Sequence, residues 1–342
     1  MKAIVYTQYG SPDVLELKEV EKPAPKEDEV LMQVYAVSVN AADWRLVRAE
    51  PFLVRLYNGL LKPKHTILGS DVAGRVEAVG RNVTQFQPGD EVFGDLSGCG
   101  WGGFAEYVCA PEHILVSKPP RATFEEAATI PMAGVTALQG LRDKGQIKPG
   151  QKVLIQGTGG GVGTFAVQIA KAFGAEVTAV CSTRNVDLAR SLGADHVIDY
   201  TQEDFTKNEQ RYDLILAANG YHPISDYKRA LRPRGMYVST GGSEAQMYQS
   251  MFLGPWMSMT GGKKMGSSAK KTSKKDMAFL KELLEEGKVK PVIDRRYTLC
   301  ETAEAIRYLE EGHARGKVVI AVDQASCNGE MSQHAIISKE DQ

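Results

Sequence analysis

The stretch Gly157–Gly163 has the residue types and spacing best suited to chemistry, because a turn of this kind could hold a phosphate group. It departs from the strict G-x-G-x-x-G spacing, and the best fit places Thr158, Gly160 and Gly163 at the three glycine positions. Glycine lets the backbone approach a phosphate closely, and a following helix offers unpaired N–H groups at its positive end. On its own the stretch also fits a plain strand-to-helix turn without a ligand, so the surrounding elements decide.

Those surrounding elements are predicted on both sides of the turn. The apolar run Lys152–Gln156 is typical of a buried strand, Phe165–Ala170 has helical periodicity, and Glu176–Val180 reads as a second strand. Together they predict a βαβ unit, which is the nucleotide-binding half of a doubly wound sheet.

The segment after the second strand indicates which nucleotide is bound. A carboxylate there would bind the ribose 2′-hydroxyl of NAD, but no acid occurs before Asp187. The hydroxyls of Ser182 and Thr183 and the guanidinium of Arg184 could instead bind a 2′-phosphate. We therefore expect NADPH, with NADH less favoured. The two hydroxyls also suit the cap of a helix that starts near Val186, and both roles are compatible.

Composition sets bounds on the remaining possibilities. The chain has 342 residues, enough for two domains, and its net charge of −1 gives no indication of nucleic acid or an anionic membrane as the main partner. No apolar run reaches the length of a transmembrane helix, so no membrane insertion is expected. The five cysteines are scattered and form no C-x-x-C pair, which favours a reducing cytoplasm.

The character of the chain changes near residue 125. Residues 1–120 alternate short apolar runs with turn signals, which is typical of a barrel-like β unit. Strands and helices then alternate, with further strands expected at 195–200, 212–217 and 235–239. This is an α/β pattern with a parallel sheet. Because strand ends on one side of such a sheet form the ligand crevice, we expect Asn219, Thr240 and Gly241 near the cofactor.

Two later segments allow more than one interpretation. Met247–Met259 is apolar and aromatic, so it could pack in the core or line a substrate cleft or subunit interface. Lys263–Lys275 carries six lysines between small polar residues. A solvated loop is the interpretation we favour for it, with an anion site as the alternative.

Residues 1 to about 323 resemble a medium-chain dehydrogenase/reductase. The motifs that carry the resemblance are Leu68–Gly74, Val76–Gly80, Phe86–Val92, Gly103–Tyr107, Ala133–Leu138 and Ser191–Asp195. The resemblance implies a GroES-like β-barrel domain for the substrate over residues 1–124 and 288–323. It also implies a Rossmann NADP-binding domain over residues 125–287 and a flexible tail over residues 324–342.

The positions where zinc-dependent members of that superfamily carry metal ligands look different here. A Cys, a His-Glu pair and a further Cys correspond to Asn40, Ser70-Asp71 and Ala133. An amide is a poor zinc ligand, and a serine and an alanine cannot replace imidazole and thiolate. The lobe of four closely spaced cysteines is missing as well. We therefore expect no zinc, and the chain is similar to the zinc-independent quinone oxidoreductases and alkenal or enone reductases.

The same resemblance implies roles for individual residues. The nicotinamide end of the cofactor would meet Asn40 and Thr136; the pyrophosphate would meet Gly160, Gly161 and Val162; the 2′-phosphate would meet Ser182, Arg184 and Tyr200; and Lys317 would reach back to the cofactor. Near the expected cleft, Asn40, Tyr57 and Ser70 are the catalytic candidates. Tyr57 also fits plain packing and Ser70 a turn hydroxyl, with water as the alternative proton source.

The predicted function is NADPH-dependent, zinc-independent hydride transfer to a quinone or an α,β-unsaturated carbonyl. The resemblance implies a homodimer, with edge pairing expected near Met257–Met265. Two alternatives stay open. One is an enoyl-thioester reductase, for which Lys263–Lys275 would form a basic entrance. The other is a non-catalytic NADP-binding adaptor.

Overall fold

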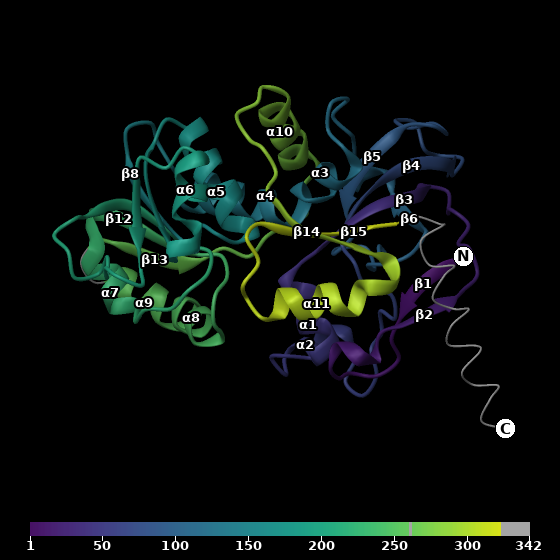
Figure 1. Cartoon of the computed structure of the whole chain (residues 1–342), viewed down its shortest axis with the longest axis horizontal. Coiled ribbons are helices and arrows are strands. Elements are labelled where there is room, and N and C mark those ends of the chain that lie inside the picture. Colours follow the sequence, from purple (N-terminus) through teal and green to yellow (C-terminus); the bar gives the residue numbers. More distant parts are fainter. Residues whose placement is uncertain (260–261, 323–342) are drawn as a thin grey trace. The chain divides into compact units, whose positions relative to one another are not determined.

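The alternation of strands and helices predicted after residue 150 is confirmed in the computed structural model, which describes residues 1–259 and 262–322 (Figure 1). The chain divides into two units. Unit 1 comprises Met1–Pro131, Arg295–His313 and the residues from Val318 on, and unit 2 comprises Met132–Asp294 and Ala314–Lys317. The tail predicted for residues 324–342 lies outside the described residues.

Unit 2 is built on a parallel sheet. Its strands are β8 (Lys152–Gln156), β9 (Glu176–Cys181), β10 (His196–Asp199), β11 (Tyr212–Ala217), β12 (Leu231–Ser239) and β13 (Lys264–Ser267). Among the described residues they pair in the order β10-β9-β8-β11-β12-β13, every pair parallel. This order is that of a doubly wound dinucleotide-binding sheet, whose strand order reverses between β8 and β11. The predicted fold class is confirmed.

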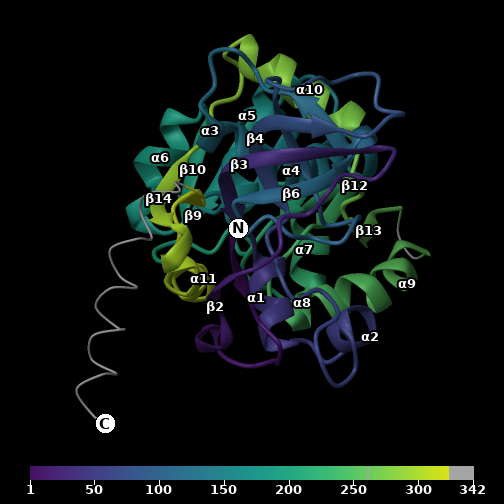
Figure 2. The same ribbon diagram turned by 90° about the vertical axis from the view of Figure 1, so that its right-hand side faces the viewer.

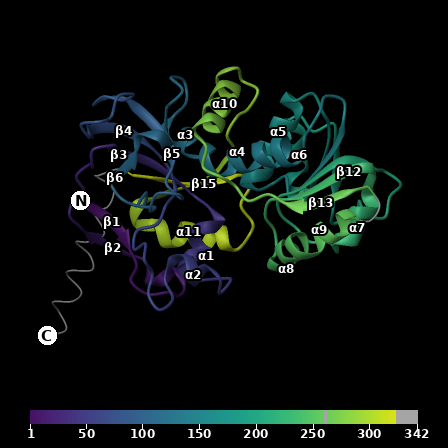
Figure 3. The same ribbon diagram turned by 180° about the vertical axis from the view of Figure 1, so that it is seen from behind.

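Helices cover both faces of this sheet. In Figures 1 and 3, α5 (Gly161–Ala172) and α6 (Val186–Ser191) lie on one face, and α7 (Ile224–Ala230), α8 (Glu244–Tyr248) and α9 (Gly254–Met259) lie on the other. The unit also contains most of α4 (Ile130–Leu138), α10 (Lys274–Glu285) and the helical turns Gln139–Lys144, Thr183–Asn185 and Gln249–Leu253. Because both faces are covered, the central strands are buried almost throughout, which explains their continuous apolar sequences.

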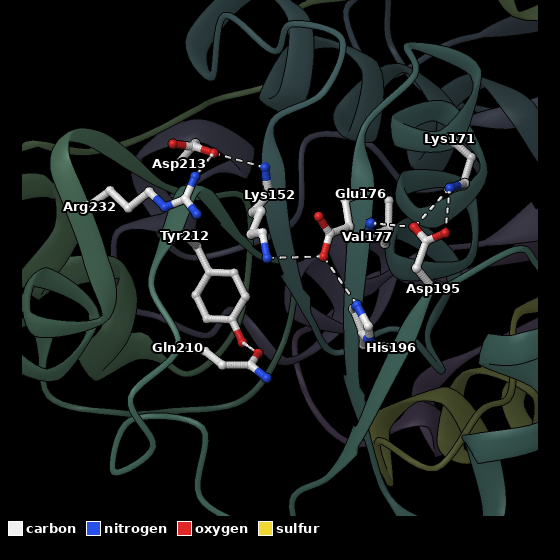
Figure 4. Close-up of polar contacts among 10 residues, drawn as sticks. All are labelled: Lys152, Lys171, Glu176, Val177, Asp195, His196, Gln210, Tyr212, Asp213 and Arg232. Atoms are coloured by element: carbon white, nitrogen blue, oxygen red, sulfur yellow. Dashed lines mark hydrogen bonds and ion pairs between the residues drawn. The ribbon is translucent and has the colours of Figure 1, made fainter.

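Ionic contacts tie together the amino ends of the strands in unit 2, which we call the amino edge (Figure 4). The ion pairs are Lys152–Glu176 (3.3 Å), Lys171–Asp195 (2.8 Å) and Arg232–Asp213 (2.9 Å), and the His196 ring lies within hydrogen-bond distance of Glu176 (3.1 Å). Two carboxylates also accept backbone N–H groups: Asp213 accepts from Lys152, and Asp195 accepts from Val177. Side chains and backbone at this edge thus bind one another.

Unit 1 contains the second large sheet. Its strands are β3 (Glu29–Val39), β4 (Asp71–Val79), β5 (Glu91–Asp95), β6 (Tyr107–Pro111), β7 (Leu115–Ser117), β14 (Ile293–Thr298) and β15 (Lys317–Ala321). Among the described residues the order is β14-β15-β3-β4-β5-β7, with β6 also paired to β3. The long strand β3 pairs with β6 along its first half and with β15 along its last residues. A separate hairpin joins β1 (Lys2–Val5) and β2 (Glu16–Glu19).

Short helices connect the strands of unit 1. They are α1 (Ala41–Arg48), α2 (Val54–Asn58), α3 (Phe124–Ala128), α11 (Thr302–Glu310) and the 3-10 turns Pro12–Val14, Glu112–Ile114 and Leu299–Glu301. Helix α1 starts directly after β3 because Asn40 and Asp43 form a capping box, in which the Asp43 carboxylate accepts the Asn40 N–H at 2.7 Å. Helix α1 contacts both α2 and α11, and Figure 2 shows α2 at the margin of the unit.

The solvated loop expected over Lys263–Lys275 is partly wrong. Residues Lys264–Ser267 form β13, the edge strand of the parallel sheet, and Lys274 opens α10. The strand is only four residues long. Its exposed Lys264 stands next to the buried Met265, so the sequence does not resemble that of a buried strand. A run so short carries too little alternation for sequence periodicity to show.

Core packing, one interpretation of Met247–Met259, is also wrong for most of that segment. Phe252 and Trp256 are exposed, at 68% and 66% of their surface, and so are Met251 and Met259. Small residues face the sheet instead. Gly254 is buried, and the Ser258 hydroxyl accepts a hydrogen bond from the backbone N–H of Met265 in β13 at 2.8 Å. Most of the large side chains therefore point away from the sheet, whereas Met257 packs against its buried cluster.

Among the described residues, no helix combines the length and the apolar character that crossing a membrane requires.

Candidate functional site

The glycine turn lies at the carboxyl ends of the strands of unit 2, which we call the carboxyl edge. Gly157 ends β8 with φ of +82°, a conformation that glycine adopts without strain. Thr158 takes the place of the first glycine of the motif, and its hydroxyl donates to the carbonyl of Val180 at 3.2 Å. The threonine side chain is thus buried and bonded to β9, which explains why this position accepts a side chain.

The remaining glycines differ in what requires them. A Cβ at Gly163 would lie 2.1 Å from the carbonyl oxygen of Gly157, so the fold itself requires glycine there. A Cβ at Gly160, in contrast, would have its nearest described protein atom, the same carbonyl oxygen, at 3.8 Å. Gly160 is also the N-cap of α5, and Gly161 and Val162 form the first turn of that helix. The open space at Gly160 therefore adjoins the first N–H groups of α5, which have no partner within that helix, as an anion site requires.

A segment distant in the sequence completes this turn. Gly316 pairs in parallel with Gly160, and a Cβ at Gly161 would meet the Cδ atom of Lys317 at 2.8 Å. Lys317 is 3% exposed, and its N–H donates to the carbonyl of Val292 at 2.8 Å. The predicted position of Lys317 beside the turn agrees with this geometry.

Sequence analysis missed the neighbouring Arg315 as a site residue. Its Nε atom donates to the side-chain oxygen of Asn185 at 3.2 Å, and Asn185 lies directly against Gly159, where a Cβ would clash with its amide. The sequence contained an indication that Arg315 belongs to the site, because this residue directly precedes the Gly316-Lys317 pair. Arg315 thus adds a second cation, besides Lys317, to the surroundings of the turn.

The segment predicted to bind a 2′-phosphate follows β9. Ser182 accepts a hydrogen bond from Asn185 at 3.3 Å and makes no capping bond, so the helix-cap interpretation is wrong for it. Thr183 does not cap α6 either, because its hydroxyl donates to Asp199 at 2.6 Å. Arg184 lies in the same 3-10 turn and is exposed.

Asp199 is a carboxylate that sequence analysis did not expect beside this segment. It ends β10, and the hydrogen bond from Thr183 is the main reason why its pKa lies below the usual value, with further bonds from Thr201 and Gln202. It was overlooked because it comes from the third strand, whereas the sequence argument considered only acids after the second. Tyr200 follows it and is 61% exposed.

The other predicted cofactor residues of unit 2 lie at further strand ends or on α4. Asn219 follows β11, and its backbone N–H approaches the Gln156 carbonyl at 3.4 Å, next to Gly157. Thr240 follows β12, its N–H bonds the Ala217 carbonyl at 3.0 Å, and Gly241 comes next. These residues therefore share one sheet edge with the glycine turn. Thr136 is on α4, where its hydroxyl donates to the Met132 carbonyl at 2.6 Å.

In unit 1 the structure brings Asn40 and Ser70 together around the buried carboxylate of Asp71. The Asn40 amide donates to Asp71 at 3.0 Å, and the hydroxyls of Ser70 and Ser38 donate to it at 3.2 Å and 3.4 Å. All four side chains are buried. Neutral donors thus surround the buried carboxyl group, and these bonds fix the orientation of the amide and hydroxyl groups.

Tyr57, the third catalytic candidate, does not join this buried cluster. It lies on α2 and is 55% exposed, and its hydroxyl donates to the Ser97 carbonyl at 3.2 Å and accepts from the Trp101 indole at 3.3 Å. The residue before Ser97 connects it indirectly to the cluster, because the Leu96 N–H donates to the Ser70 carbonyl at 2.8 Å.

No metal centre is evident in the parts of the chain that the structure describes. Over residues 1–259 and 262–322, no group of three or more His, Cys, Asp and Glu side chains could hold a metal ion. Burial raises the pKa of the Cys181 thiol near the glycine turn, which disfavours the thiolate that a metal would need.

Comparisons with known proteins agree with this geometry. Residues 26–120 match the alcohol dehydrogenase GroES-like domain, and residues 192–320 match a family described as zinc-binding dehydrogenase. The chain is 35% identical over 334 residues to a chloroplastic quinone-oxidoreductase of Triphysaria versicolor, covering 94% of this chain and 98% of that one. It is 34% identical over 331 residues to a chloroplastic NADPH-dependent alkenal/one oxidoreductase of Arabidopsis thaliana, covering 94% and 79%. It is also 34% identical over 316 residues to a trans-enoyl reductase of Aspergillus terreus, covering 87% of each.

The fold matches solved structures as well. The quinone oxidoreductase of Coxiella burnetii superposes with a TM-score of 0.84 at 31% identity, over 94% of this chain and 99% of that one. The protein is a two-domain dehydrogenase with a GroES-like and a Rossmann part. It belongs to the medium-chain dehydrogenase/reductase family, among the quinone oxidoreductase-like members.

Proposed function

We propose that this protein is an NADPH-dependent, zinc-independent reductase that transfers a hydride to a quinone or an α,β-unsaturated carbonyl. The observation that carries the proposal is the open space at Gly160. No described protein atom lies close enough to a Cβ at this position to require glycine, whereas a bound phosphate would require it. The relatives named as quinone and alkenal/one oxidoreductases support the acceptor class.

In this proposal unit 2 holds the nicotinamide cofactor. The pyrophosphate would bind the N–H groups of Gly160, Gly161 and Val162 at the start of α5. Thr158 holds the turn to β9, and Asn219, Thr240 and Gly241 line the same edge of the sheet. The bound cofactor supplies a hydride, and the protein supplies orientation and exclusion of water.

The preference for NADPH rests on charge at the end of β9. Arg184 and Arg315 both lie within this part of unit 2, and Ser182 and Thr183 add hydroxyls. The negative charge of Asp199 would repel a 2′-phosphate. This carboxylate, however, accepts hydrogen bonds from Thr183 and Thr201, which compensate part of that charge. Tyr200 would cover the adenosine end, and Lys317 would approach the turn from the other side.

In unit 1, Asn40 and Ser70 would orient the acceptor. Asp71 accepts hydrogen bonds from both side chains, and the Ser38 carbonyl accepts a second bond from the Asn40 amide at 3.1 Å, so the oxygen lone pairs of Asn40 and Ser70 are what they can offer to a ligand. A proton would come from water or from the Tyr57 hydroxyl. Thr136 and Asn40 are proposed for the nicotinamide end.

The test is NADPH oxidation against a panel of quinones, alkenals, enones and enoyl thioesters, with NADH in parallel. We expect turnover with quinones or enones and faster turnover with NADPH. Faster turnover with NADH would contradict the cofactor assignment, and about one bound zinc per chain in elemental analysis would contradict zinc independence. Bound NADPH without oxidation by any acceptor would favour the adaptor role.

An enoyl-thioester reductase is the second candidate, favoured by the similarity to a trans-enoyl reductase. In the panel it would appear as a preference for the thioester over the matching enone. The basic entrance suggested for Lys263–Lys275 has less support, because Lys263 donates to the Lys228 carbonyl at 2.7 Å and its neighbour belongs to β13.

The assembly and the compartment stay predictions. We propose a homodimer paired along the edge strand β13, near Met257–Met265, with small-molecule partners and no nucleic acid. Size-exclusion chromatography with light scattering would test the dimer. We propose a cytoplasmic location, although the relatives named above include chloroplastic proteins, and microscopy of the tagged protein would test it.

A further inference from the structure

Helix α2 and its flanks present an unusually apolar surface in unit 1. The exposed large side chains of this segment are Phe52, Leu53, Leu56, Tyr57, Leu60 and Leu61, with Leu56 70% and Leu61 85% exposed. We call residues 51–64 the α2 surface. Contiguous apolar exposure of this kind marks an interaction site, because single exposed apolar residues are common but a run of six is not.

The charge of the α2 surface has one sign. Residues 51–66 contain Arg55, Lys62 and Lys64 but no Asp or Glu. Lys62 and Lys64 are exposed, and the Arg55 guanidinium lies 4.9 Å from the centre of the Tyr9 ring and 5.8 Å from that of Phe52. Cations thus border the apolar residues directly, as in peripheral segments that bind anionic membranes.

The backbone beneath this surface is held by buried contacts. Asn58 is fully buried, donates to the Tyr6 hydroxyl at 2.8 Å and accepts the His65 N–H at 3.1 Å. The Tyr9 hydroxyl donates to the Gly59 carbonyl at 2.6 Å. The leucines are therefore displayed by a fixed loop and do not fall back onto the unit.

We propose that the α2 surface docks on an anionic phospholipid bilayer. Its leucines and Phe52 would enter the boundary between headgroups and acyl chains, while Lys62, Lys64 and Arg55 bind the lipid phosphates. This is binding to a membrane surface and needs no membrane-spanning helix. Tyr57 belongs both to this surface and to the catalytic candidates, but vesicle binding can be measured without any substrate, so it is tested separately from the reaction proposed above.

The other exposed apolar segment of the chain is a natural comparison. Residues 248–259 expose Met251, Phe252, Leu253 and Trp256, but they include no Lys or Arg. The Lys228 ammonium group that lies against this segment donates to the Met257 carbonyl at 3.1 Å, so an anionic surface would gain less electrostatically there than at three cations of the segment itself. Charge complementarity therefore distinguishes the α2 surface and selects lipid as its partner.

The experiment is co-sedimentation of the full-length protein with two kinds of vesicle. One contains phosphatidylcholine with about 30 mol% phosphatidylglycerol, and the other contains phosphatidylcholine alone. We expect binding to the anionic vesicles that falls as salt rises. Lys62→Gln with Lys64→Gln should weaken the partition coefficient roughly 30-fold, on the basis of the usual contribution of each basic residue.

Apolar variants separate insertion from simple charge attraction. Leu56→Gln with Leu61→Gln should weaken binding about tenfold or more, whereas the matched pair Met251→Gln with Phe252→Gln in unit 2 should leave it unchanged. Circular dichroism and thermal unfolding verify that each variant is folded. Absence of vesicle binding by the wild-type protein would overturn the proposal. So would equal binding by the leucine variant, or concentration-dependent self-association that the leucine variant abolishes in place of vesicle binding.

Discussion

The two edges of the parallel sheet in unit 2 are made of the same strands but of opposite kinds of residue. At the amino edge, Lys152, Glu176, Asp195 and Asp213 bind neighbouring side chains or backbone N–H groups (Figure 4). At the carboxyl edge, glycines, hydroxyls and amides follow the strands, and the space at Gly160 is open.

This difference shows which edge can accept a ligand. Polar groups that already bind one another gain little from a new partner, whereas helical N–H groups at the start of α5 have none within their own helix. The amino edge contributes stability and the carboxyl edge binds the cofactor in our proposal. Substitutions at matched positions can test that division.

The largest effect is expected at Gly160. Gly160→Val should weaken NADPH binding about 100-fold or more while the melting temperature stays within about 2 °C of the wild type, because its side chain would occupy only the cofactor's space. Calorimetric titration and thermal unfolding measure the two quantities. Gly163→Val is the contrasting control and should unfold the protein, because its Cβ would overlap the Gly157 carbonyl. A Gly160→Val protein that binds NADPH normally would contradict the proposed phosphate site at Gly160.

The second effect concerns the choice between the two cofactors. Arg184→Ala and Arg315→Ala should each reduce the ratio of NADPH to NADH affinity by roughly 10-fold to 100-fold, the value of a charge-assisted hydrogen bond to phosphate. Fluorescence titration with both nucleotides gives the ratio. Asp199→Asn should move the ratio the opposite way, because it removes a negative charge beside the same segment. An unchanged ratio in both arginine variants would place the 2′-phosphate elsewhere.

A smaller effect is expected at the amino edge. Asp213→Ala removes the acceptor of the Lys152 N–H and the partner of Arg232, and it should lower the free energy of unfolding by about 1–2 kcal/mol. The dissociation constant of NADPH should not change, in contrast to the carboxyl-edge variants. Urea unfolding measures the stability of the variant, and titration with NADPH measures its dissociation constant. Weaker NADPH binding by Asp213→Ala would contradict the proposed difference between the two edges.

The smallest effect depends on pH. Burial acts to raise the pKa of Asp195, but the bonds from Lys171 and from the Val177 N–H outweigh it, so the folded pKa lies below the ordinary value of about 3.9. The carboxylate therefore stabilises the fold above about pH 4, and this contribution is lost as the pH falls through the folded pKa. Asp195→Asn should cost less than about 1 kcal/mol at pH 7. Its urea midpoint should approach that of the wild type below about pH 4, and a constant difference would contradict this linkage.

The sequence was sufficient to predict the parallel sheet and most of its carboxyl edge. Long apolar runs and glycine turns are local signals, so β8, α5 and β9 could be placed without coordinates. Contacts between distant segments could not be placed in this way. The Asp199–Thr183 bond and the Arg315–Asn185 bond join parts of the chain that only the pairing of strands brings together.

Unit 1 shows the same limit for side chains. The sequence singled out Asn40 and Ser70, but it could not show that the Asp71 carboxyl group is the centre that holds both. Net charge has a related limit. A value of −1 for the whole chain conceals the cationic, acid-free segment around α2.

The pairing of Gly316 with Gly160 has a consequence for synthesis of the chain on the ribosome. The glycine turn is translated about halfway through, yet the segment that closes beside it comes near the end of the described chain. Two residues later, Val318 begins to pair with Val39 of β3. Neither unit can therefore reach its final pairing cotranslationally until residues 316–318 have been made, and a ribosome that stalls before residue 314 would release a chain in which both units are still open.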